Sequence, residues 1–344
     1  MAENTRANGP VGEEVTPPIA RALTRELLSV LAPFAGLALI YAFFGICDVW
    51  DPTESNFYRL FGTYNLKSVA AQTTTVAVAA LGMTLVIISA GIDLSPGSSI
   101  ALTITVIALW LKSGGGAFGA LVLGVLSATV VGLVNGIVIT RLRVVPFIAT
   151  LGMMLVARGL AKLLAGGQRV TAPTTWLEGL LAVDASPDAP FWKVPSGLIA
   201  LVVVAVLVHI VLGYTVFGRY VFAIGSNEAT ARLCGINVRL QKTLIYTVCG
   251  LLTGLAGALQ FSYLRVGDPT AAVGKELDII ASVVIGGGSL AGGRGSVLGT
   301  IIGAFVMGVL RNGCDIYGIP NSWQEVFIGL IIVGAVSLDS FRRR

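Results

Sequence analysis

Asp93 places a carboxylate inside a long apolar stretch, in the run GIDLSPG at 91–97. A charge in such surroundings is costly and marks a functional or tightly paired position. Pro96 and Gly97 would break a helix here and free its backbone groups. One interpretation is contact with a substrate or an ion along a pathway. The other, which the spacing favours, is a cap in which Asp93 or Ser95 satisfies the start of the next helix.

Other polar side chains also lie within apolar segments, at Asn135, Arg158, Gln260 and Asn312. Each is more often a link between helices than a ligand contact. A second break follows at 286–296, where the glycine-rich run GGGSLAGGRGS contains Ser289. The candidates for lining or gating a pathway are therefore Asp93, Ser95, Asn135, Ser289 and Asn312.

Catalytic chemistry has little support in this sequence. The sole histidine, His209, lies in an apolar segment without a nearby carboxylate or nucleophile and is expected to pack in the core. The glycine runs at 114–119 and 286–291 fit a loose dinucleotide pattern, but neither follows a strand. The sequence contains no P-loop. We therefore predict a chain that is not an enzyme, binds no cofactor or metal, and does not hydrolyse ATP by itself.

A polar, basic stretch at 214–242 separates two apolar segments and is the best candidate for docking a second protein. Ser226 can cap a short helix at 227–234, with Glu228 in its first turn and Gly235 as a left-handed stop. So short a helix is not stable alone in water. Either its membrane flanks or a partner's groove must hold it, and an ordinary loop with one helical turn is the alternative.

Composition places the chain in the membrane. Of 344 residues, 55% are hydrophobic and only 12% are charged, and the mean hydropathy is +0.86. These values predict an all-α integral membrane protein in contact with the lipid bilayer. The net charge of +5 is better explained by lysine and arginine residues that set the orientation of the chain in the membrane than by nucleic-acid binding. The four cysteines show no C-x-x-C spacing.

We distinguish about ten apolar segments, which together form one transmembrane domain at 27–340. The third, eighth and ninth are shorter than a full crossing and are expected to be tilted, half-length or re-entrant. Five segments per half would give an inverted repeat, although the sequence shows no convincing residue-level repeat. The segments are 27–46, 68–90, 98–111, 117–140, 146–164, 197–212, 243–264, 277–285, 297–310 and 326–336.

Lysine and arginine placement orients these segments. With ten crossings and both termini in the cytoplasm, the basic 214–242 loop falls inside and the acid-rich loop at 165–195 falls outside, in agreement with the positive-inside rule. The polar residues 1–26 are expected to form a disordered cytosolic tail.

Four long runs resemble the ribose-type sugar permeases of bacterial ABC importers, and the resemblance covers nearly all of the chain from about residue 65. They are GMTLVIISAGIDLSPGSSIAL at 82–102, NGIVITRLRVVPFIATLGMMLVARGLA at 135–161, GSNEATARLCGI at 225–236, and ELDIIASVVIGGGSLAGGRGSVLGTIIGA at 276–304.

This resemblance implies a multi-pass permease of the bacterial inner membrane, with a fold similar to that of the cobalamin importer permease. It implies a second permease copy, cytosolic ABC ATPase subunits that bind the ATP, and a periplasmic binding protein that delivers a pentose, a hexose or a related polyol. The family's Glu-Ala-Ala…Gly coupling signature corresponds to Glu228, Ala229 and Gly235, with Thr230 in place of the second alanine. Asn227, Glu228 and Arg232 are expected at the ATPase interface.

Two alternatives remain from the sequence. One is an ABC permease for nucleosides or branched-chain amino acids, whose hydropathy pattern is similar. The other is a secondary carrier or channel that works without an ATPase. Ion coupling would require paired charges within the bilayer, and Asp93 and Arg158 are the only clear ones that the sequence offers.

Overall fold

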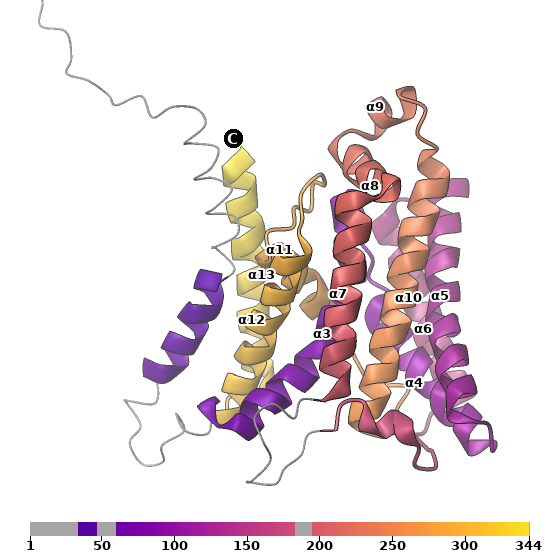
Figure 1. Cartoon of the computed structure of the whole chain (residues 1–344), viewed down its shortest axis with the longest axis vertical. Helices are drawn as coiled ribbons and strands as arrows, with labels where there is room; N and C mark the ends of the chain where they lie inside the picture. The colour runs from indigo at the N-terminus through magenta and orange to yellow at the C-terminus, as the bar shows by residue number, and fades with distance from the viewer. Residues whose placement is uncertain (1–33, 47–59, 183–194, 344) are drawn as a thin grey trace, which may run out of the picture.

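The computed structural model describes residues 34–46, 60–182 and 195–343. Most of these residues are helical, and the helices stand side by side as one bundle (Figure 1). Six of the described helices are long and apolar enough to cross a membrane: α3, α5, α6, α7, α10 and α12. The prediction of an all-α multi-pass membrane protein is confirmed. The expected tail at 1–26 lies outside the described residues.

The first half of the chain forms four long helices after a short one at Phe34–Ile46. They are α3 (Thr63–Ile88), α4 (Pro96–Lys112), α5 (Ala117–Arg141) and α6 (Pro146–Leu164).

The second half begins with α7 (Ser196–Tyr214) and continues with α8 (Val216–Ser226) and α9 (Glu228–Leu233). It then forms α10 (Val238–Leu264), α11 (Lys275–Ile285), α12 (Val297–Ile316) and α13 (Asn321–Arg343). Between the halves, the expected external segment contains strand β1 (Val170–Thr171) and the 3-10 turn η1 (Trp176–Gly179). Strand β1 pairs antiparallel with β2 (Val266–Gly267), which follows α10.

Helix α3 forms the centre of the bundle. Its best apolar window is 94% buried, whereas that of α6 is 17% buried. A helix that is apolar all round belongs in the interior, and α3 fits this rule because α7, α10, α11 and α12 all pack against it. The outward faces of α6 and α7 carry exposed aliphatic side chains, which suit contact with lipid tails.

Two antiparallel helix pairs build the core. Helices α5 and α10 approach closely where Gly132 faces Gly250, since a Cβ at Gly250 would lie 3.0 Å from the Cα of Gly132. Small residues permit this spacing in membrane bundles. Helices α3 and α12 are linked by Thr84 and Thr300, whose hydroxyls are 2.8 Å apart. The pairing of α5 with α10 therefore has a counterpart in that of α12 with α3.

The two crossing segments that follow α3 and α10 are broken in the same way. Asp93 Oδ1 accepts hydrogen bonds from the backbone N–H of Ser95 at 2.8 Å and from its hydroxyl at 2.7 Å. Asp268 Oδ1 accepts the same two bonds from Thr270, at 2.8 and 2.6 Å. Helix α4 begins directly after the first turn, and α11 begins a few residues after the second. The same Asp-x-Ser/Thr turn thus occurs in both halves.

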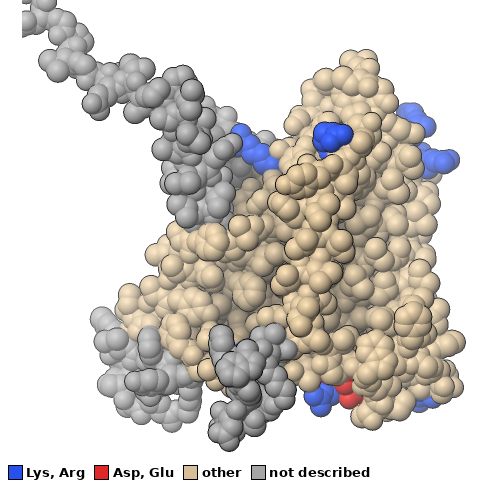
Figure 2. Space-filling model, viewed as in Figure 1, with Lys and Arg blue, Asp and Glu red and all other residues tan. Residues whose placement is uncertain are grey.

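Charged side chains gather at the two ends of the bundle and leave an uncharged band between them on the face shown in Figure 2. Such a band is what a bilayer-spanning surface requires. Helix α9 lies at one end, and the C-terminal end of α13 lies at the same end (Figure 1).

Several helices are longer than their expected segments. The ninth segment is a full helix of 20 residues, so its expected shortness is wrong, because α12 continues through polar residues as far as Ile316. The third and eighth segments are indeed short, with 17 and 11 residues. Of the described helices, only six meet the length and hydropathy expected for a full span, so the ten-segment count exceeds the crossings shown.

Candidate functional site

Helix α9 is a short helix that stands on the end of the bundle, joined to α8 on one side and α10 on the other (Figure 1). Its N-cap is Asn227, whose side-chain oxygen accepts the N–H of Thr230 at 2.9 Å. Ser226 is the last residue of α8, so the expected Ser226 cap is wrong and the cap lies one residue later. Gly235 has φ +83°, as a left-handed stop requires.

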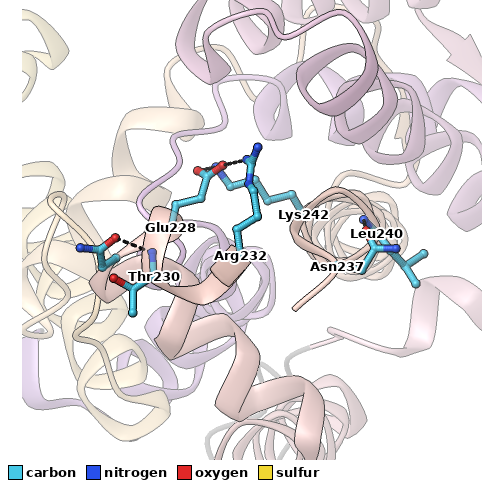
Figure 3. Close-up of polar contacts among 7 residues, drawn as sticks. Glu228, Thr230, Arg232, Asn237, Leu240 and Lys242 are labelled. Carbon is cyan, nitrogen blue, oxygen red and sulfur yellow. Dashed lines mark hydrogen bonds and ion pairs between the residues drawn. The ribbon is translucent and has the colours of Figure 1, made fainter. Parts of the chain in front are cut away.

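Glu228 ties α9 to the bundle (Figure 3). Its carboxylate accepts hydrogen bonds from Arg232 Nη2 at 2.7 Å, one turn along α9, and from Lys242 Nζ at 2.6 Å, in the first turns of α10. Partial burial alone would raise the pKa of Glu228, but the hydrogen bonds and positive charges of Lys242 and Arg232 outweigh it, so the pKa is lowered below its usual value. Glu228 is therefore ionised at neutral pH.

A small apolar cluster holds the underside of α9. Ala231 is 4% exposed and packs with Ile224 of α8 and Val238 of α10. On the outer side, Ala229 is exposed and Leu233 is 89% exposed. A leucine this open, beside the charged pair of Glu228 and Arg232, gives α9 an apolar contact point. The sequence analysis missed both Leu233 and Lys242, because neither belongs to a capping pattern.

The end of α8 is wedged between two other segments. Gly225 lies against the carbonyl oxygen of Ile88, the last residue of α3, so closely that a Cβ would overlap that oxygen. The same carbonyl accepts the N–H of Gly293 at 2.8 Å. Ser289 belongs to this glycine-rich connection between α11 and α12, where its N–H donates to the carbonyl of Arg294. Ser289 thus belongs to a connection that contacts the end of α3, a few residues before the Asp93 turn.

Three of the candidate pathway residues form one buried network. Ser95 donates to Asp93, and Asn135 Nδ2 of α5 donates to Ser95 Oγ at 3.0 Å. All three side chains are almost fully buried, and Asn135 Oδ1 has no hydrogen-bond partner among the described residues. Ser95 is the N-cap residue of α4, yet its hydroxyl makes no cap bond to the helix. Asp93 therefore accepts hydrogen bonds from Ser95, the N-cap residue of α4. This differs from the predicted cap, in which Asp93 or Ser95 satisfies the start of the helix itself.

Asn312 lies apart from this network. It exchanges two hydrogen bonds with Asn65 of α3, at 2.8 and 3.0 Å, and so links α12 to α3. His209 was expected in the core but is exposed on α7, because that helix faces outward. Arg158 Nη1 donates to the carbonyl of Ala271 at 2.5 Å. Asp93 and Arg158, the two charges suggested for ion coupling, therefore hydrogen-bond to separate partners.

These features define a class of protein: a helical membrane protein with broken helical segments and a short helix standing on one end of the bundle, as in membrane transport subunits. Residues 65–336 match the family described as branched-chain amino acid transport system / permease component, and the chain belongs to this permease family.

Relatives among the curated proteins include sugar permeases. The chain is 39% identical over 285 residues to the ribose import permease protein RbsC of Escherichia coli (strain K12), covering 82% of this chain and 87% of the relative. It is 37% identical over 313 residues to RbsC of Bacillus subtilis (strain 168), covering 91% and 93%. The fructose import permease protein FrcC of Rhizobium meliloti is 31% identical over 292 residues, covering 83% and 80%. The predicted membership among sugar ABC permeases is confirmed. No solved structure matches the chain.

Proposed function

We propose that this chain is the membrane subunit of an ATP-driven importer, through which a monosaccharide crosses the bacterial inner membrane. The observation that carries this function is its identity with ribose and fructose import permeases over most of their length. A pentose, a hexose or a related polyol is therefore the proposed substrate. In this arrangement a periplasmic binding protein delivers the sugar.

Helix α9 is the proposed contact with a cytosolic ATPase subunit, which binds the ATP. Three features support this role: the exposed leucine at 233, the ionised Glu228 beside Arg232, and the rigid support from Ala231 and Lys242. Interfaces draw most of their affinity from a few apolar or charged anchors surrounded by polar contacts. Asn227 and Gly235 serve this surface indirectly, because they begin and end the helix, and Ala229 is exposed on its outer side.

The contact between Gly225 and Ile88 gives a route from α9 into the membrane domain. Helices α8 and α9 are joined through Asn227 alone, so a displacement of α9 would carry the end of α8 with it. Gly225 has no clearance from Ile88, and the displacement would therefore reach α3 and the glycine-rich connection. Closure of the ATPase could in this way bias the permease between inward-facing and outward-facing states.

We further propose an inverted five-plus-five repeat with ten membrane segments, similar to the cobalamin importer permease. The recurring Asp-x-Ser/Thr turns and the matching antiparallel pairs support it. The asparagines at 135 and 312 each stand in a Leu-x-Asn-Gly run on α5 and α12, which adds a sequence correspondence. With α9 in the cytoplasm, the C-terminus lies inside, and an even number of crossings puts the N-terminus there too. A second copy of the chain completes the path, as the resemblance implies.

The rival substrate class follows from the family description, which names branched-chain amino acids. A carrier that works without an ATPase is the rival from a different class.

Uptake by cells that express the complete importer separates these cases, with labelled D-ribose, D-fructose, L-leucine and adenosine as probes. Sugar uptake that is lost when the ATPase is deleted supports the proposal. Uptake of only L-leucine or adenosine, or uptake without an ATPase, would overturn it.

A pull-down tests the docking surface. The double variant Glu228→Ala/Arg232→Ala should lose the co-purifying ATPase and sugar uptake together. The matched control is Arg169→Ala/Asp268→Ala, which removes an ion pair of 2.8 Å next to the β1–β2 pairing, away from α9. The control should retain the ATPase. Equal ATPase recovery from both double variants would contradict docking at α9.

A further inference from the structure

A cavity lined by both polar and apolar residues lies between α11, α12 and α13. Its volume is about 430 Å³, within the range of small-molecule sites. Asp278 of α11 and Arg311 of α12 line its inner wall, and Asn321 and Glu325 of α13 line the rest of its polar surface. Aliphatic side chains complete the wall, among them Leu277 and Ile328.

Asp278 and Arg311 form an ion pair, with Arg311 Nη2 donating to Asp278 Oδ1 at 2.8 Å. Asp278 is 2% exposed, and Arg311 Nε has no hydrogen-bond partner among the described residues. Buried charges in membrane helices are expensive and generally face a cavity or a pathway. The pair also stands between the cavity and a smaller space of about 40 Å³ toward α3, which it lines together with Thr73 and Lys275. Thr73 is 2% exposed, and its hydroxyl also has no partner among the described residues.

The corresponding corner of the first half is packed with apolar side chains. Where α4, α5 and α6 meet, Leu102, Val131, Ala157 and Ala161 form a buried apolar cluster. The corner of α11, α12 and α13 has the same order of helices along the chain and an apolar cluster of its own, in which Ala281, Leu310 and Ile328 take part, but it has a cavity and an ion pair beside that cluster. Packing alone would favour the filled arrangement, since voids and buried charges both cost stability. The difference points to a function for the second corner.

We infer that this cavity binds the transported monosaccharide, with Asp278, Arg311, Asn321 and Glu325 as its hydrogen-bonding groups. A sugar hydroxyl both donates and accepts, so it can donate to the carboxylates and accept from the guanidinium and the amide. The charges of Asp278 and Arg311 neutralise one another, so the pair adds no net charge to the cavity. Leu277 and Ile328 offer apolar surface to the C–H face of a sugar ring. The inference rests on the proposed function, because it names where that substrate binds.

The position of the cavity fits this role. Asn321 and Glu325 lie in the first turns of α13, and the other end of that helix lies on the side of α9 (Figure 1). The polar residues of α13 that line the cavity are therefore in the half of the bundle away from the proposed ATPase contact. A sugar released by a periplasmic binding protein would meet this half first.

Cysteine labelling in the complete importer tests the site. Gly329 lines the cavity, and a Cβ there would meet no atom within 4 Å, so Gly329→Cys should be tolerated. Gly334→Cys is the matched control, since Gly334 is on the same helix, is equally unobstructed, and does not line the cavity. Both are made in a chain with Cys47→Ser and Cys234→Ser, in cells that contain the ATPase and the binding protein. The reagent is a water-soluble methanethiosulfonate.

D-ribose, and in a parallel experiment D-fructose, should slow the labelling of Gly329→Cys about tenfold at saturation, because occupancy shields the thiol. The labelling of Gly334→Cys should not change. If the unmodified importer takes up either sugar but that sugar leaves Gly329→Cys labelling unchanged, the cavity is not the binding site. Protection by L-leucine instead would overturn the sugar assignment. Failure of the unmodified importer to take up either sugar would be a failure of the proposed function itself, and the uptake assay registers it separately.

Discussion

Gly225 of α8 lies in direct contact with the carbonyl oxygen of Ile88, the last residue of α3. That oxygen also accepts the N–H of Gly293 from the connection between α11 and α12. A single carbonyl group therefore joins the end of α8, next to α9, to the central helix of the bundle and to the glycine-rich connection. The absence of a side chain at 225 is what allows this contact.

Gly225→Ala should disturb this contact. The added methyl group would overlap the Ile88 carbonyl, and overpacking of this kind costs about 1–3 kcal/mol. We expect a lower unfolding temperature of the purified chain and reduced sugar uptake at equal membrane abundance. Gly213→Ala is the control, because a Cβ at Gly213 would meet no atom within 4 Å. Equal effects of the two variants would contradict a special role for Gly225.

Leu233→Ser should weaken the association with the ATPase. Leu233 is 89% exposed on α9, so the change removes no internal packing, and the loss of an interface anchor costs about 2 kcal/mol or roughly 30-fold in affinity. Quantitative pull-down at increasing ATPase concentration measures the shift. Leu163→Ser is the control, since Leu163 is 81% exposed at the far end of α6. If both serine variants bind the ATPase as the unmodified chain does, Leu233 is not an anchor.

The features of α9 that follow local rules could be predicted from the sequence. A Glu in the first turn and a Gly at the stop depend on the helix itself, and both are found at Glu228 and Gly235. The cap was placed one residue early because Ser226 and Asn227 are both good caps, and only the end of α8 distinguishes them. The bond from Lys242 depends on how α10 packs against α9, which no local pattern encodes.

The ion pair in the cavity shows the same limit. The sequence analysis recognised Asp93 and Arg158 as intramembrane charges but passed over Asp278 and Arg311. Asp278 stood at the beginning of a short segment, and Arg311 followed directly after the expected end of the ninth. Helix α12 in fact continues to Ile316, so Arg311 lies within it. Asp278 and Arg311 each look like a boundary residue in the sequence, and they form one ion pair, with Asp278 buried, only when α11 and α12 pack together.

Acidic pH should weaken the hydrogen bonds with which Glu228 stabilises α9. Its pKa is lowered in the folded chain, because Lys242 and Arg232 outweigh the effect of partial burial. The stabilisation of α9 by Glu228 is therefore complete above the pKa of a Glu in an unfolded chain, about 4.3. It is lost as the pH falls through the lower pKa that Glu228 has in the folded chain. Hydrogen exchange of the α9 amides in the unmodified chain and in Glu228→Gln measures this. The ratio of α9 amide protection in the unmodified chain to that in Glu228→Gln should be constant from about pH 8 to pH 5. It should approach one in stronger acid.

The control for this measurement is an amide group in α10 beyond the reach of Glu228, such as that of Leu252, for which the ratio should stay at one. A ratio for α9 that is already one at neutral pH would show that the bonds to Arg232 and Lys242 do not stabilise α9. A ratio that rises toward acid would contradict the lowered pKa.

Single substitutions of Asp278 or Arg311 should lower the stability of the chain, whereas substitution of both residues should change it little. Arg311→Gln leaves Asp278, which is 2% exposed, as a buried charge without its partner, at a cost of about 3–5 kcal/mol. Asp278→Asn leaves Arg311 unpaired in turn. The double variant Asp278→Asn/Arg311→Gln keeps two side chains that can hydrogen-bond and removes both charges. We therefore expect it to unfold close to the temperature of the unmodified chain and well above either single variant.

Sugar transport should separate this double variant from the unmodified chain even though their stabilities are similar. Neutral amides offer weaker hydrogen bonds to hydroxyl groups than a carboxylate and a guanidinium do, by roughly a factor of two in energy per bond. If the pair contacts the sugar, the uptake rate should fall about tenfold, the equivalent of about 1.4 kcal/mol, while the ATPase still co-purifies through α9. Normal uptake by a stable double variant would show that the pair only supports the helices. A double variant as unstable as the single ones would instead show that the charges themselves hold α11 against α12.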